Sequence, residues 1–62
     1  MKTFEWYRKL AIDAEDMDDW EVAADYWQMA IDAYPNGTGM LRARDLQHMQ
    51  DRKELCLWEA KA

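Results

Sequence analysis

The sequence has little of the residues that build cross-linked or metal-bound proteins. Cys56 is the only cysteine, so the chain cannot form an internal disulfide. A single cysteine is typical of a protein in a reducing compartment, or of a small side chain that is buried in a core. Its only histidine, His48, lies eight residues earlier. That separation is about 12 Å along a helix, too far for a catalytic Cys–His pair, and the two residues do not close a zinc site. We therefore predict a protein that is not an enzyme and that holds no metal and no cofactor.

Long hydrophobic runs and glycine-rich loops are also missing. No run approaches the roughly 18 apolar residues of a transmembrane helix. The start of the chain lacks the apolar core and the cleavage site of a signal peptide. Gly37 and Gly39 are not followed by the Lys-Ser or Lys-Thr of a phosphate-binding loop. These absences favour a cytoplasmic protein that makes no membrane contact.

Basic residues are absent from the whole span between Leu10 and Leu41. Acidic residues fill that span, and the chain has a formal net charge of −5. Direct nucleic-acid binding needs a cationic surface, so we expect no direct nucleic-acid contact. A solvated acidic face explains the pattern without any partner. The alternative is a docking surface for a basic protein, including one whose own ligand is nucleic acid.

Aromatic residues and methionines are abundant, with four Trp, three Tyr, one Phe and five Met in 62 residues. A domain of this length buries only about 60% of the surface of its unfolded chain. One tight core could use much of this apolar load. A homodimer or partner surface could use the rest.

Hydrophobic periodicity predicts one all-α domain, residues 1–62, with helices at about 4–16, 19–34 and 40–60. Thr3 is a candidate N-cap of the first helix, and Asp18 with Glu21 has the spacing of a capping box for the second. Pro35 ends the second helix, Asn36-Gly37 predicts a turn, and Thr38 or Gly39 starts the last helix. The polar residues of that helix occupy one narrow arc, so its broad apolar surface should be covered from more than one side. They are Glu21, Asp25, Gln28 and Asp32.

The first two helices match the spacing of a tetratricopeptide hairpin. The matching positions are Tyr7-x2-Leu10-Ala11-x2-Ala14 and Ala23-x3-Trp27-x2-Ala30-x4-Pro35. Small residues at these positions allow two antiparallel helices to approach closely. One such unit cannot bury its own faces, so we expect residues 40–60 to pack over it. The predicted fold is a tetratricopeptide-like antiparallel hairpin plus a C-terminal helix.

The chain also resembles the small ANR proteins, negative regulators of AraC-type activators in enteric bacteria and their phages. The residues that carry the resemblance are Ala14-Glu15, Trp20, Ala23-Ala24, Trp27, Ala30 and Arg52-x3-Cys56. The resemblance implies a protein that binds a transcription factor or nucleoid protein and represses its action without chemistry.

Two functions follow from charge, aromatics and resemblance. The first is a negative regulator that occupies the basic surface of a nucleic-acid-binding protein, in particular a transcription regulator. The second is a phage-encoded inhibitor of a host defence nuclease, similar to an anti-CRISPR, in which carboxylates substitute for phosphates. Ile12 and the stretch Leu55–Trp58 are apolar residues that could be either core or contact surface. The predicted partner-binding residues are Asp18, Asp19, Trp20, Glu21, Asp25, Asp32, Tyr34 and Trp58.

Overall fold

The computed structural model describes residues 3–35 and 40–62, without the side chains of residues 40 and 41. Within these ranges it contains three helices and no strand. They are α1 (Phe4–Asp16), α2 (Trp20–Ala33) and α3 (Met40–Lys61). The predicted all-α class and its three helices are confirmed, and every helix end lies within one residue of the expected one. The predicted turn at Asn36-Gly37, and the start of the last helix at Thr38 or Gly39, lie outside the described residues.

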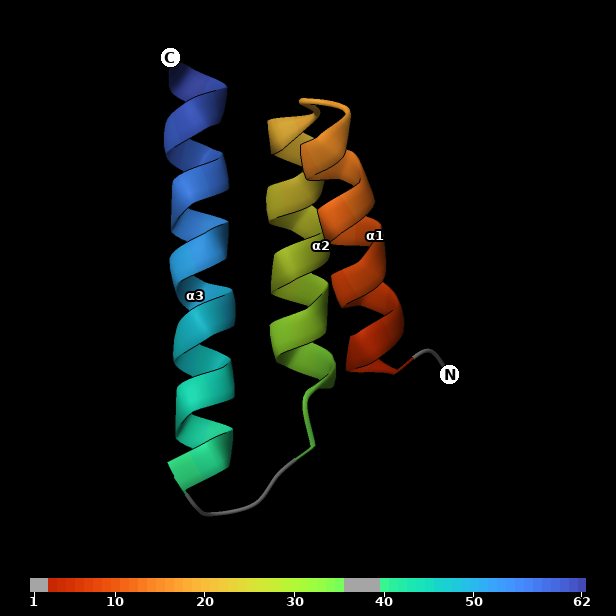
Figure 1. The fold of residues 1–62 in the computed structure, drawn as a ribbon, viewed down its shortest axis with the longest axis vertical. Helices are drawn as coiled ribbons and strands as arrows, with labels where there is room; N and C mark the ends of the chain where they lie inside the picture. Colours follow the sequence, from red (N-terminus) through yellow and green to blue (C-terminus); the bar gives the residue numbers. More distant parts are fainter. Residues whose placement is uncertain (1–2, 36–39) are drawn as a thin grey trace.

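Helix α2 lies between α1 and α3 and runs antiparallel to both of them (Figure 1). Helices α1 and α3 meet each other at only a few points. The Cα atoms extend over 36 × 23 × 14 Å, so the three helices form a flattened layer. The expected packing of α3 over the hairpin is therefore confirmed, with α2 as its main neighbour. No helix of the described ranges combines the length and apolar character needed to cross a bilayer.

The junction between α1 and α2 differs from the predicted one. Thr3 caps α1 as expected, because its side-chain oxygen accepts a hydrogen bond of 3.3 Å from the Trp6 amide. Asp18, however, has a φ of 58° and belongs to the end of α1. The amides of Asp18 and Asp19 donate to the carbonyls of Glu15 and Ala14, as in a Schellman motif. The capping box was therefore a wrong prediction: the N-cap of α2 is Asp19, whose side chain makes no cap hydrogen bond.

The core is built from small residues around one large ring. Trp27 of α2 is 1% exposed and is the largest fully buried side chain of the described residues. The alanines let the backbones of α1 and α2 approach, so the predicted basis of the hairpin is confirmed. Helix α3 contributes only Met49 and Cys56 among its described side chains. The other buried residues are Ala11, Ala14, Ala23, Ala24 and Ala30.

Parts of the predicted apolar faces are not covered. Val22 and Met29 of α2 are 38% and 44% exposed, although α1 and α3 cover this helix from more than one side, as predicted. Two neighbouring helices leave the side of α2 that faces away from both of them in contact with solvent. On α3, Ala43 is exposed as well.

Candidate functional site

Three carboxylates form an exposed row along α2, which we call the acidic edge: Glu21, Asp25 and Asp32. Helical spacing places them on one side because they are four and seven residues apart. Asp32 accepts a hydrogen bond of 2.8 Å from the side-chain amide of Gln28. No lysine or arginine of the described residues forms an ion pair with any member of the acidic edge. The negative charge of this row therefore remains unneutralised within the described part of the chain.

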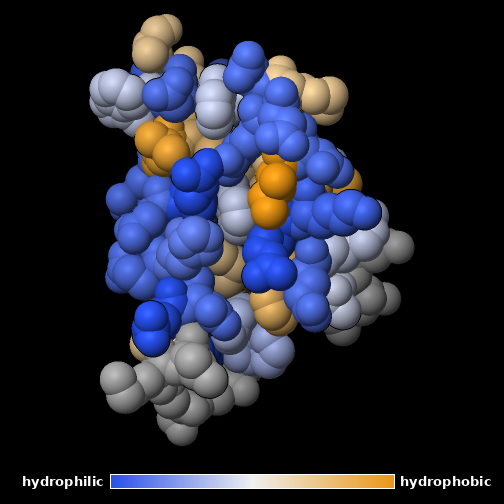
Figure 2. Space-filling view, in the orientation of Figure 1, coloured by the Kyte–Doolittle hydropathy of each residue, from blue (hydrophilic) through white to orange (hydrophobic). Residues whose placement is uncertain are grey.

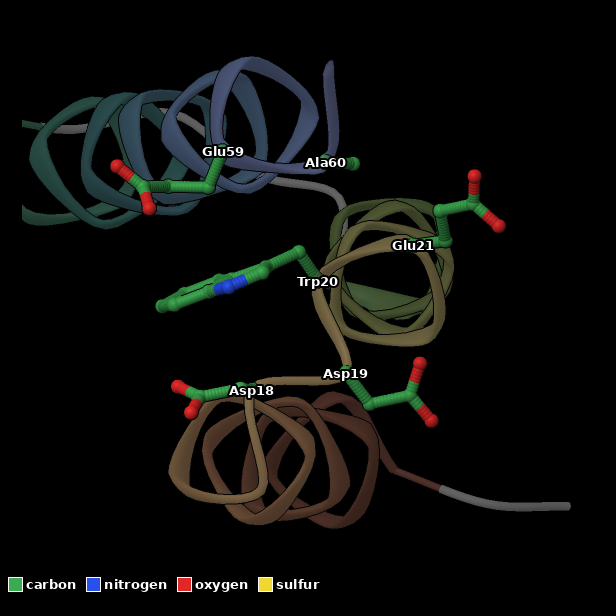
Figure 3. A pocket seen from close by; sticks show the side chains of 6 residues that line it. All are labelled: Asp18, Asp19, Trp20, Glu21, Glu59 and Ala60. Atoms are coloured by element: carbon green, nitrogen blue, oxygen red, sulfur yellow. The ribbon is translucent and has the colours of Figure 1, made fainter. Parts of the chain in front are cut away.

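A small open pocket lies at the end of the molecule where α1 turns into α2 (Figure 3). Its volume is about 230 Å³. The half-buried indole of Trp20 extends into it, with the carboxylates of Asp18 and Glu59 on either side, while Glu21 points away from the ring. The lining residues are Asp18, Asp19, Trp20, Glu21, Glu59 and Ala60.

The pocket joins four of the predicted partner-binding residues and adds two from α3. Sequence reasoning missed Glu59 and Ala60, because their place depends on where the last turn of α3 ends beside the first turn of α2. Only the expected antiparallel packing of α2 and α3, together with their lengths, could have indicated that the end of α3 lies beside the start of α2. The predicted Asp25 and Asp32 lie further along α2 and do not line the pocket.

The other two predicted aromatics have different environments. Tyr34 is half-buried at the end of α2, where its ring centroid lies 4.6 Å from that of Phe4 and its hydroxyl donates to Asp45 at 2.6 Å. That hydrogen bond raises the pKa of Tyr34. Trp58 is 67% exposed on α3 and does not line the pocket. The structure therefore places Tyr34 within the packing of the three helices and Trp58 on the surface.

A part-buried hydrogen-bonded group, which we call the Glu15 cluster, joins all three helices. Its members are Glu15, Trp27, Arg52 and Cys56. The Glu15 carboxylate accepts from the indole N–H of Trp27 at 2.6 Å and from the Cys56 thiol at 3.4 Å. It also forms an ion pair with Arg52. These four residues carry much of the resemblance described above, and sequence reasoning did not recognise that they meet. The spacing of Arg52 and Cys56, four residues apart on one helix face, was the available signal.

Burial and hydrogen bonding act in opposite directions on Glu15. Burial raises its pKa, but the hydrogen bonds from Arg52, Trp27 and Cys56 outweigh burial, and the pKa lies below its ordinary value of 4.5. For Cys56, burial and the neighbouring Glu15 carboxylate together raise the pKa to about 11. The thiol is therefore protonated near neutral pH and is a poor nucleophile.

The described residues show no pairing of Cys56 with His48. The Cys56 thiol donates to Glu15, and the exposed His48 ring meets the Trp27 ring edge-on at a centroid distance of 6.3 Å. In the ranges 3–35 and 40–62, no group of three or more potential ligands could hold a metal ion. The arrangement of the Glu15 cluster is suited to holding three helices together.

Hydrophobic atoms on the face shown in Figure 2 form separate small patches among hydrophilic residues. Exposed large apolar side chains nevertheless occur on all three helices. The candidate site therefore consists of the acidic edge, the Trp20 pocket and exposed apolar side chains, including Ile12 and Trp58. Comparisons of the chain with models of protein families, with curated protein sequences and with solved structures find no match.

Proposed function

We propose that the protein is a non-enzymatic binding module that inhibits a nucleic-acid-binding protein, a transcription regulator, by occupying its basic surface. The observation that carries this proposal is the acidic edge, whose carboxylates are exposed and have no cationic partner among the described residues. The resemblance to negative regulators of AraC-type activators supports the choice of target class.

A row of carboxylates can compete with nucleic acid for the same cationic surface. Dissolved salt screens the attraction between exposed carboxylates and the basic side chains of the target, so the affinity should fall as the salt concentration rises. Charges on the acidic edge would also speed the encounter with a basic partner. The protein would inhibit by occupancy alone.

The Trp20 pocket fits the same partner chemistry. Its exposed carboxylates, Asp18 and Asp19, and the nearby Glu59 attract a lysine or arginine side chain, and the face of an indole binds such cations as well. Trp residues often carry a large share of binding energy at interfaces. We therefore place one anchoring contact of the partner at Trp20 and the longer electrostatic contact along α2.

Capture of the target and charge reversal test this function. The protein should recover a basic transcription regulator from a lysate of its source organism. The triple variant E21K/D25K/D32K should then bind that target at least about tenfold more weakly at low salt, with unchanged helicity by circular dichroism. The control E5K/D51K/E54K carries the same change in net charge at other exposed positions and should bind far more strongly than the first variant.

Each other outcome has a defined meaning. Equal weakening by both triple variants would show that net charge matters and that the acidic edge is not the interface. Recovery of a defence nuclease would assign the protein to the second target class. Recovery of no basic protein would overturn the proposed function.

A further inference from the structure

Three large apolar side chains of α1 and α2 are exposed to solvent. They are Trp6, Val22 and Met29, with exposed fractions of 43%, 38% and 44%. We call them the apolar strip. Val22 and Met29 are seven residues apart, so they lie on one face of α2.

The apolar strip lies on the side of the hairpin opposite to the Glu15 cluster. Phe4 contacts Tyr34, and Glu15 bonds to Trp27, so these contacts mark one side of the α1–α2 pair. On a helix, the side chain of residue i+2 points about 200° around the axis from that of residue i, which is close to the opposite direction. Trp6 follows Phe4 by two positions, Met29 follows Trp27 and Val22 follows Trp20. The three side chains therefore project from the other side of the same two helices.

Acidic residues surround the apolar strip on both helices. On α2, Asp25 stands between Val22 and Met29, and Asp32 follows one turn later. On α1, Asp13 lies two turns beyond Trp6, and Lys9 is the only basic residue on that side. All of these charged residues are exposed.

Helix α3 shows which kind of helix this hairpin accepts. Its buried residues Met49 and Cys56 are seven residues apart, the same spacing as Val22 and Met29. Between them lie two basic residues that bond to the hairpin: Arg52 pairs with Glu15, and Lys53 donates to the side-chain oxygen of Gln28 at 2.5 Å. Helix α3 is thus an example of a helix that packs on this acidic pair of helices through apolar residues flanked by cationic side chains.

We propose that the apolar strip and its acidic border bind a cationic amphipathic α-helix of the partner protein. The proposal rests on the proposed function and specifies its interface. The partner helix would place apolar residues against Val22, Met29 and Trp6 and its lysines or arginines beside the carboxylates of Asp13, Asp25 and Asp32. A second copy of this chain is disfavoured as the occupant because like charges would then face each other.

A designed peptide tests the surface independently of any natural target. The probe is an 18-residue Leu/Lys peptide with leucines at helical positions i, i+3, i+4 and i+7, and a scrambled peptide of the same composition is the control. The amphipathic peptide should bind in isothermal titration, and the scrambled peptide should bind at least about tenfold more weakly. The variant V22Q/M29Q should also lose about tenfold or more in affinity for the amphipathic peptide.

The matched control is L55Q/L57Q, which removes two apolar side chains of similar exposure, 40% and 41%, from α3. It should leave binding of the peptide unchanged. Gln is a good helix former, so circular dichroism should show both variants folded. Equal weakening by the two variants, or equal binding of the scrambled peptide, would overturn the proposal. So would a dimer of the unmodified protein in sedimentation that V22Q/M29Q dissociates.

The two proposals fail in different ways. Suppose that E21K/D25K/D32K weakens binding of a captured basic target and V22Q/M29Q does not. The apolar strip is then not part of the interface, and the proposed function stands. If the Leu/Lys peptide binds at the apolar strip but the lysate yields no basic protein, the surface is right and the proposed function is wrong.

Discussion

The helices on the two sides of α2 are held by different kinds of contact. Helix α1 packs through fully buried alanines, with Ala11 and Ala14 in one core with Ala23 and Ala30 of α2. Helix α3 buries only Met49 and Cys56 among its described side chains. Side-chain hydrogen bonds supplement these two residues, from Arg52 to Glu15, from Lys53 to Gln28 and from Tyr34 to Asp45.

This difference predicts which helix should separate more easily from α2 when individual contacts are removed. Close packing of alanines involves many small contacts, so no single polar group controls the α1–α2 pair. The docking of α3 depends on a few directional contacts, and several of them end on one carboxylate, that of Glu15. We therefore expect α3 to open more easily than the hairpin, because elements with few buried apolar contacts open at lower free energy.

The largest expected effect comes from a change that removes both kinds of contact at once. Trp27 is buried, bonds to Glu15 of α1 and meets His48 of α3. The variant W27A should lose about 3–5 kcal/mol of the free energy of unfolding. Native domains have only about 5–15 kcal/mol in total, so this loss removes a large part of the stability. Urea denaturation followed by circular dichroism measures this loss.

The control for this prediction is W58A, since Trp58 is 67% exposed. It should change the free energy of unfolding by no more than about 0.5 kcal/mol. Similar losses for both variants would show that Trp58 is packed in solution and that the core does not centre on Trp27.

Sequence periodicity predicted the helices because each has buried residues at helical spacing, and Thr3 was a recognisable cap. It did not predict the Schellman motif at Asp18, where aspartate takes a position that glycine usually occupies. It correctly predicted that α2 is covered from more than one side, by α1 and by α3, but it did not predict which apolar side chains of α2 remain exposed. The apolar arc of one helix does not state how many neighbours will pack on it, so the exposure of Val22 and Met29 depends on the angle between α1 and α3.

The candidate site was predictable only in part. The acidic edge follows directly from spacing along one helix, which is a local property. The Glu15 cluster and the Trp20 pocket unite residues that are far apart in sequence, such as Glu15 with Arg52 and Trp20 with Glu59. Their meeting is set by the packing of α3, which no local pattern encodes.

The second prediction sharpens the comparison by loosening α3 more than the hairpin, since two residues of α3, Arg52 and Cys56, bond to Glu15. The variant E15Q keeps the size of the side chain but removes the charge that Arg52 pairs with, and its amide group faces donors from Trp27 and Cys56. The expected loss is about 1–3 kcal/mol. Amide hydrogen exchange should show faster exchange in α3 than in α1 and α2. Equal acceleration in all three helices would show that they open as one unit and would remove the distinction.

The smallest expected effect is the pH dependence of the same contact. Glu15 has a lower pKa in the folded protein than its ordinary value of 4.5, so folding favours the ionised carboxylate. This contribution to stability is fully present above about pH 4.5 and is lost as the pH falls through the lowered pKa. Other carboxylates also titrate there, so the quantity to measure is the difference in the free energy of unfolding between the unmodified protein and E15Q. That difference should be largest near pH 7 and should shrink as the pH falls below 4.5, with α3 losing amide protection before the hairpin. A difference that stays constant from neutral to acidic pH would show that the Glu15 charge does not hold α3 in place. The contrast between the two sides of α2 would then rest on Met49, Cys56 and the hydrogen bonds of α3 that do not involve Glu15.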